Sequence, residues 1–209
     1  MSDIPLSEVE NAVGVRFMRV PAGCPVEILE HLVETKFVTD GVYEFKADKH
    51  GKKSVLVLMK AQSDVANAVE WFSGRFYHPD GPDQPAVMLN PIPNEMRYVR
   101  LFNSNTNKVV VKNVPSTTDT HVLFMAMAGV GEIVDFTISC TIDRPVYRAY
   151  VQYLEFRSCQ EAVTKLDRSY VQDIQIRVEH YTTATTQIRP PVTSNTSIYV
   201  CGLPMRFST

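Results

Sequence analysis

The residues best suited to chemistry are scattered along this sequence and do not form a catalytic pattern. The five histidines stand alone, and neither a glycine-rich phosphate loop nor a Gly-x-Ser-x-Gly elbow occurs. The four cysteines are widely spaced and never form Cys-x-x-Cys, so no zinc site is indicated. We therefore expect a protein that is not an enzyme, needs no cofactor and keeps its thiols reduced in the nucleus or the cytoplasm.

A different chemistry is indicated where an aromatic residue stands beside cations. Arg148, Tyr150 and Gln152 recur at every second position of residues 146–154. In a β-strand such residues point to one face. A tyrosine ring can stack on a base, and a guanidinium can stack or bind a phosphate. The pattern favours a surface that binds single-stranded nucleic acid.

Charge is distributed unevenly along the chain. The net charge of −2 does not by itself indicate a polyanionic partner. Residues 1–95 carry 9 basic and 14 acidic side chains, whereas residues 96–194 carry 11 basic and 9 acidic ones. The second half therefore presents the more favourable field to a nucleic acid. No apolar run of about 18 residues occurs, so no membrane partner is expected.

The elements that must position these side chains follow the order β-α-β-β-α-β in the second half. The pattern predicts strands over residues 108–115, 132–140, 146–154 and 174–179, with helices that begin near Asp119 or Thr118 and at Ser158. The first half repeats this order more loosely, with strands over residues 15–20, 42–47, 54–59 and 86–89 and helices over residues 25–37 and 63–72. Each block is a split βαβ sandwich.

We therefore expect an α+β chain of two tandem β-α-β-β-α-β domains and the first strand of a truncated third. The expected segments are an N-terminal tail (1–12), domain 1 (13–92), a linker (93–106), domain 2 (107–181), a second linker (182–196) and the third strand (197–209). One strand cannot fold alone, so we expect a fragment of a longer protein.

Two short motifs and this element order resemble the RNA recognition motif family. Residues 198–204 are similar to the strand-one motif of that family, with Tyr199 at its aromatic position, whereas Val110 replaces the aromatic in residues 109–115. Residues 146–153 are similar to its strand-three octapeptide, although Arg148 stands where a second aromatic is common. The resemblance implies ferredoxin-like domains whose sheets bind single-stranded RNA.

Strand alternation predicts which side chains of domain 2 would contact RNA. With Val109, Val111 and Ala149 turned to the helices, the opposite face is the open one. We expect the RNA-binding residues to be Lys108, Val110, Lys112, Arg148, Tyr150, Gln152, Gln175 and Arg177, together with Tyr199 of the third copy.

Domain 1 is predicted to be different because its open face lacks an aromatic residue. Alternation places there the candidate protein-interaction residues Arg16, Met18, Val55, Val57 and Met59. Aliphatic side chains on an exposed sheet tend to be covered. The cover could be the proline-rich segment from residue 90 onward, domain 2, a second copy of the chain or another protein.

A second protein-binding candidate follows the second helix of domain 1. Residues 74–77 are similar to the Arg-x-Phe loop of protein-binding members of the superfamily, with Tyr77 in place of the phenylalanine. That resemblance implies a tryptophan-containing peptide held by Arg75 and Phe76, although Gly-x-x-aromatic is also usual in ordinary members. Trp71 is expected in the core, since it continues the apolar stripe of its helix.

Two functions remain open at this point. One is a single-stranded RNA-binding protein that regulates mRNA processing, stability or splicing. The other is a protein-interaction or dimerisation module whose degenerate domains do not bind RNA strongly. The similarity of residues 148–153 to the polypyrimidine-tract-binding and hnRNP-L group implies pyrimidine-containing RNA as the ligand of the first.

Overall fold

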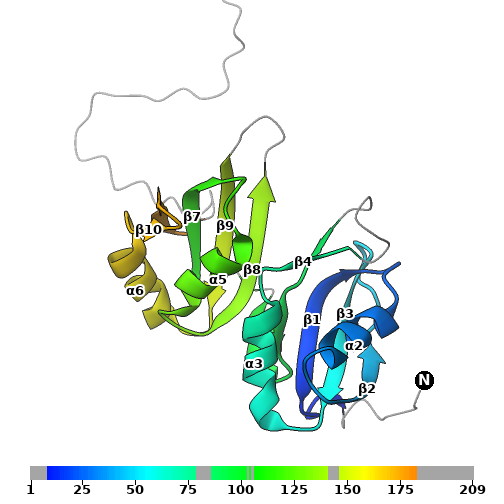
Figure 1. The fold of residues 1–209 in the computed structure, drawn as a ribbon. Coiled ribbons are helices and arrows are strands. Elements are labelled where there is room, and N and C mark those ends of the chain that lie inside the picture. Colours follow the sequence, from blue (N-terminus) through cyan, green and yellow to red (C-terminus); the bar gives the residue numbers. More distant parts are fainter. Residues whose placement is uncertain (1–8, 79–85, 103, 105, 141–145, 183–209) are drawn as a thin grey trace, which may run out of the picture.

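The computed structural model describes residues 9–78, 86–102, 104, 106–140 and 146–182, and they form two α+β domains (Figure 1). Each domain has a four-stranded antiparallel sheet, so the predicted fold class is confirmed for both. Among the described residues no helix is both long and apolar enough to cross a membrane. The strand predicted for a third copy, including Tyr199, lies outside the described residues.

Domain 2 has the strand order β12-β7-β9-β8. Its sheet strands are β7 (Lys108–Pro115), β8 (Ile133–Cys140), β9 (Val146–Tyr153) and β12 (Arg177–His180), and its helices are α5 (Thr120–Ala128) and α6 (Phe156–Leu166). Asp119 caps α5, because its carboxylate accepts hydrogen bonds from the backbone N–H groups of His121 and Val122.

The side chains predicted to face the helices of domain 2 form its core. Val109, Val111 and Ala149 are fully buried and belong to one cluster with Leu123 of α5 and Cys159 of α6. Burial raises the pKa of the Cys159 thiol to about 11. The helices therefore cover one face of the sheet, and the other face, here called the open face, carries the alternate residues.

The last predicted strand of domain 2 is interrupted. β11 (Ile174–Gln175) pairs with β10 (Tyr170–Val171) in a separate hairpin, and only β12 joins the sheet. Gln175 is therefore not on the open face, and its side-chain amide donates a hydrogen bond to the Arg168 carbonyl at 3.1 Å. Its predicted role on that face was wrong, because the apolar period runs unbroken through both short strands.

Domain 1 has the equivalent strand order β2-β3-β1-β6. Its sheet strands are β1 (Gly14–Pro21), β2 (Thr39–Glu44), β3 (Lys52–Met59) and β6 (Pro91–Pro93), its helices are α2 (Val26–Glu34) and α3 (Gln62–Phe72), and a hairpin joins β4 (Phe76–Tyr77) to β5 (Val87–Met88). The last sheet strand is thus Pro91–Pro93, and not residues 86–89. Two prolines are tolerated because β6 lies at the sheet edge and pairs only with β1.

The predicted register of β3 was wrong. Val55, Val57 and Met59 are buried in the core beneath the helices, with exposed fractions of 0%, 0% and 4%. Leu56 lies on the open face instead, opposite Arg16 of β1. The error has a physical cause: five consecutive apolar residues fill β3, so alternation cannot tell its two faces apart.

A helix occupies the segment between the domains that sequence analysis left without structure. α4 (Met96–Phe102) contributes Tyr98 and Phe102 to a small apolar cluster with Ile92 of β6 and Val134 of β8. Met18 of β1 packs against the same cluster. α4 therefore packs against both sheets, and the proline-rich segment with domain 2 supplies cover for this edge of domain 1.

Candidate nucleic-acid interface

The open face of domain 2 exposes a pair of tyrosines at its centre. Tyr150 of β9 lies opposite Val110 of β7, and both point away from the helices. Tyr181 follows β12 and meets Tyr150 edge to face, with ring centroids 5.6 Å apart and planes at 86°. The two half-buried rings form an aromatic platform of the kind on which bases stack.

Tyr181 was missing from the predicted contacts. The sequence pattern ends the last strand of domain 2 at Glu179, two residues before Tyr181. The alternation between the two faces of the sheet therefore assigned no face to Tyr181. Glu179 pairs with Val110, and the Tyr181 N–H continues the ladder by donating to the Lys108 carbonyl at 2.9 Å. Extending the period by one step would have placed Tyr181 on the open face.

The cations around this platform differ in their partners. Lys112 is held by Glu179, with Nζ 2.6 Å from Oε2, and Arg177 is held by Asp167, with Nε 2.8 Å from Oδ1. Backbone and guanidinium hydrogen bonds lower the pKa of Asp167. Arg148 is exposed and makes no ion pair within the described part of the chain, so it is the cation on this face that is ready to meet a phosphate.

One end of the same face is closed to ligands. Gln152 is completely buried, and its amide donates to the Leu101 carbonyl, the Ser104 hydroxyl and the Thr106 carbonyl. Its predicted RNA contact was therefore wrong, because Leu101, Ser104 and Thr106 cover this end of β9. We call this part the covered end, and the part around Tyr150 the free end.

A buried carboxylate fixes domain 1 against the covered end. Asp135 of β8 has a side chain that is only 3% exposed, and both of its oxygens lie 3.0 Å from the guanidinium of Arg19 in β1. Asn90 donates to it at 2.9 Å. Lys108 also points toward it at 3.7 Å and is 13% exposed, so the predicted contact of Lys108 with RNA is blocked as well.

The backbone of β1 explains why Arg19 can reach across. The pairing of β1 with β3 shifts register between Phe17 and Val20, and Arg19 has a left-handed φ of 58°. A β-bulge redirects the side chain of its extra residue. Here it turns the guanidinium of Arg19 toward β8, where Thr137 also accepts a hydrogen bond from it at 2.8 Å.

The open face of domain 1 does carry aromatic residues, contrary to the sequence analysis. Tyr43 of β2 lies opposite Leu56, and its ring packs on Phe45 at 4.9 Å. The guanidinium of Arg16 lies 3.6 Å from the centre of the Phe45 ring and donates to Ser54 at 2.9 Å. Burial lowers the pKa of Arg16. Arg16 thus already occupies one face of Phe45.

The loop after α3 has its own internal contacts. Arg75 donates to the Trp71 carbonyl at 2.6 Å and lies over the Trp71 ring at 5.0 Å, while Lys36 approaches the same ring at 4.7 Å. Trp71 is 43% exposed, so its predicted place in the core was wrong. The buried stripe of α3 is Val65, Ala68 and Phe72, and Trp71 lies one position to its side. Phe76 is 50% exposed.

The comparisons with known proteins agree with this architecture. The family model of the RNA recognition motif matches residues 109–177, from β7 to the start of β12. Domain 2 is therefore an RNA recognition motif domain, and domain 1 precedes it in tandem with the same strand order. No curated protein matches the sequence.

Solved structures resemble parts of the chain at low identity. The Mip6 RRM3 domain is 22% identical and covers 38% of this chain and 96% of its own, with a TM-score of 0.35. An SXL-lethal protein/RNA complex is 16% identical over 82% of this chain and 100% of its own, with a TM-score of 0.40. Three N-terminal RNA binding domains of the yeast splicing factor Prp24 are 13% identical over 83% and 68%, with a TM-score of 0.34. At these values the similarity defines no ligand of this chain.

Proposed function

We propose that this protein binds single-stranded RNA at the free end of the open face of domain 2. The observation that carries the proposal is the pair formed by Tyr150 and Tyr181, with the exposed Arg148 on the same face. Two aromatic rings offer stacking surfaces, and a cation without an ion-pair partner offers a phosphate contact. Membership of domain 2 in the RNA recognition motif family supports the same ligand.

Because one end of the open face is covered, RNA can contact only a small area of domain 2. Gln152 and Lys108 are held by protein groups, and Lys112 and Arg177 would have to exchange their carboxylate partners for phosphates. The remaining contacts are those of the two tyrosines, Val110 and Arg148. Domain 2 is accordingly a reader of few nucleotides, and tighter binding requires further contacts elsewhere in the chain.

The proposal is tested by removing the platform. Replacing both Tyr150 and Arg148 by alanine removes one stacked base and one phosphate contact, which corresponds to a loss of affinity of about 10-fold or more. Fluorescence anisotropy with labelled random-sequence RNA of about 12 nucleotides, within the range of single-stranded binding sites, measures the change. The matched control is Tyr170→Ala with Arg157→Ala, which removes the same residue types from exposed positions off this face. Equal affinities for the two double variants would refute the site.

The cellular role that we propose is regulation of mRNA after transcription, in processing, stability or splicing, in the nucleus or the cytoplasm. Similarity of residues 148–153 to the polypyrimidine-tract-binding and hnRNP-L group supports pyrimidine-containing targets. Crosslinking in cells followed by sequencing of the bound RNA tests both points. We expect the crosslinked RNA to be mRNA or its precursors, with pyrimidine-rich crosslink sites. If the wild-type chain yields no more crosslinked RNA than the Tyr150→Ala variant, the proposed role is contradicted.

The alternative of a protein-interaction or dimerisation module has less support than it had from the sequence. It depended on Val55, Val57 and Met59 as an exposed aliphatic face, and these three side chains are core residues. Met18 is used within the chain, against the cluster that α4 forms between the domains. Val55, Val57 and Met59 are therefore not available to a second copy of the chain.

A further inference from the structure

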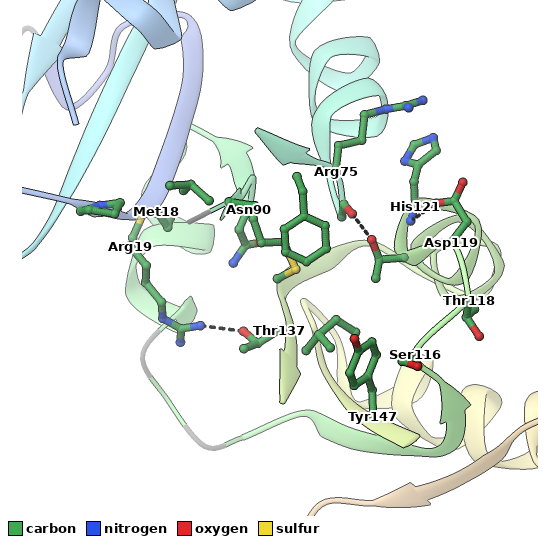
Figure 2. A pocket seen from close by; sticks show the side chains of 18 of the residues that line it. Met18, Arg19, Arg75, Asn90, Ser116, Thr118, Asp119, His121, Thr137 and Tyr147 are labelled. Atoms are coloured by element: carbon green, nitrogen blue, oxygen red, sulfur yellow. Dashed lines mark hydrogen bonds between the residues drawn. The ribbon is translucent and has the colours of Figure 1, made fainter. Parts of the chain in front are cut away.

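A cleft of about 870 Å³ lies between the two domains (Figure 2). Domain 1 lines it with the end of β1, the start of β3 and the hairpin of β4 and β5, and domain 2 lines it with the loop before α5 and with β8 and β9. Its volume is in the range of pockets that bind small molecules and cofactors. The cleft is separate from the tyrosine platform, because neither Tyr150 nor Tyr181 lines it.

The cleft begins next to the free end of the open face. Thr137 of β8 pairs directly with Tyr150 of β9, and the same Thr137 lines the cleft. Arg19 reaches Thr137 from the opposite wall, as the dashed line in Figure 2 shows. A strand of RNA that leaves Tyr150 across β8 therefore meets the mouth of the cleft as its next surface.

The lining includes several basic side chains, and most of them already have partners. Its basic side chains are Arg19, Lys52, Arg75 and His121, and Asp119 is the one carboxylate among the described residues that line it. Asp119 caps α5, the charge of Arg19 is balanced by Asp135, and Arg75 lies on Trp71. Lys52 is exposed and makes no ion pair among the described residues. Lys52 is therefore the cation of the lining that can meet an anionic ligand.

The walls also offer surfaces for a base. Phe76 is half-exposed, and Met88 and Tyr147 line the cleft with it. Ser116 and Thr118 bring hydroxyl groups, and the Thr118 hydroxyl is buried without a hydrogen-bond partner in the described part of the chain. Apolar walls, hydroxyls and cations together fit a nucleotide better than an aliphatic peptide.

We infer that RNA bound at the platform of domain 2 continues over β8 into this cleft, where Lys52 contacts a phosphate and Phe76 a base. The inference rests on the proposed function and extends it to a second site in the same chain. It makes the fixed placement of the two domains part of the binding site, since one wall of the cleft belongs to each domain. The paired residues Arg19 and Asp135 hold these walls in place.

Two pairs of variants of the full chain test the inference by anisotropy with the random-sequence RNA pool. Lys52→Ala removes one phosphate contact, so the slope of log affinity against log salt becomes shallower by about 0.7. Lys60→Ala, just beyond the opposite end of β3, removes the same charge outside the cleft and leaves the slope unchanged. Phe76→Ala weakens binding by about 10-fold, whereas Tyr170→Ala, another exposed aromatic outside the cleft, leaves it unchanged.

The outcomes separate this inference from the proposed function. If Lys52→Ala and Phe76→Ala behave like their controls while Tyr150→Ala weakens binding, RNA stays on the sheet and the cleft inference is overturned. A cleft that takes a peptide instead would give this same result. If the wild-type chain binds no RNA, both proposals fail. Crosslinking of RNA carrying 4-thiouridine to a peptide that contains Phe76, located by mass spectrometry, would support the cleft directly.

Discussion

The open faces of the two sheets have the same strand order and different surroundings. In domain 2 the centre of the face presents Tyr150 and Tyr181, and only the end near Gln152 is covered. In domain 1 the corresponding centre holds Leu56, which is fully buried, and Arg16, which lies on Phe45. The topology alone therefore does not determine which sheet can accept a ligand.

The difference lies in what each sheet does for the rest of the chain. The fourth strand of domain 1 leads directly into α4, and α4 packs between β6 and β8. The β6 edge of the domain 1 sheet is therefore covered by its contacts with domain 2. In domain 2, only the region around Asp135 and Gln152 is covered by such contacts. One domain thus acts as the support, and the other keeps a free surface.

The largest loss of stability is expected when a charge is placed on the core face of β3. Val57→Lys places a charge in the core of domain 1 and should lower the free energy of unfolding by more than about 4 kcal/mol, enough to unfold the domain. Val38→Lys makes the same change at a residue that is 61% exposed and should cost less than about 0.5 kcal/mol. Denaturant unfolding followed by circular dichroism compares them. Equal stability of the two variants would show that Val57 faces solvent.

A smaller effect is expected at the junction between the domains. Lys108 is nearly buried, and Asp135→Ala removes its carboxylate partner. The substitution should lower the free energy of unfolding by roughly 2–4 kcal/mol. This is less than the cost of breaking a fully buried pair, because Arg19 is partly exposed. The control Glu95→Ala breaks an exposed pair with Arg97 and should cost at most about 1 kcal/mol. Urea titration measures both changes. A loss at Asp135 no greater than at Glu95 would mean that Asp135 does not fix the domains.

Strong local patterns made much of this fold predictable. The alternation in β7 and β9 identified the core face of domain 2, and the apolar side chains of the first block located α2 and α3. The pattern failed where it carried no information, as in the uniformly apolar β3 and in the strand that a hairpin interrupts at Ile176. The burial of Gln152 could not be predicted, because it depends on where Leu101, Ser104 and Thr106 lie in space.

The candidate site was predictable to the same degree. Tyr150, Arg148 and Lys112 lie on the face that alternation assigned to them. Lys108 lies there too, but it is lost as a ligand contact because it points toward Asp135. Asp135 is distant in sequence and comes close because both residues pair with Gln152, one from each side of β9. Contacts made by tertiary structure, such as Arg19 on Asp135, leave no periodic signal in the sequence.

RNA binding at the free end of domain 2 is tested most sharply by comparing the aromatic pairs of the two sheets in the full chain. One variant replaces Tyr150 and Tyr181 by alanine, and the other replaces Tyr43 and Phe45, with affinity for the random-sequence RNA pool measured by anisotropy. If the free end of domain 2 binds RNA, the first variant loses about 10-fold or more in affinity, while the second stays within about threefold of wild type. A loss confined to the Tyr43 and Phe45 variant, or equal losses in both, would contradict RNA binding at the free end of domain 2.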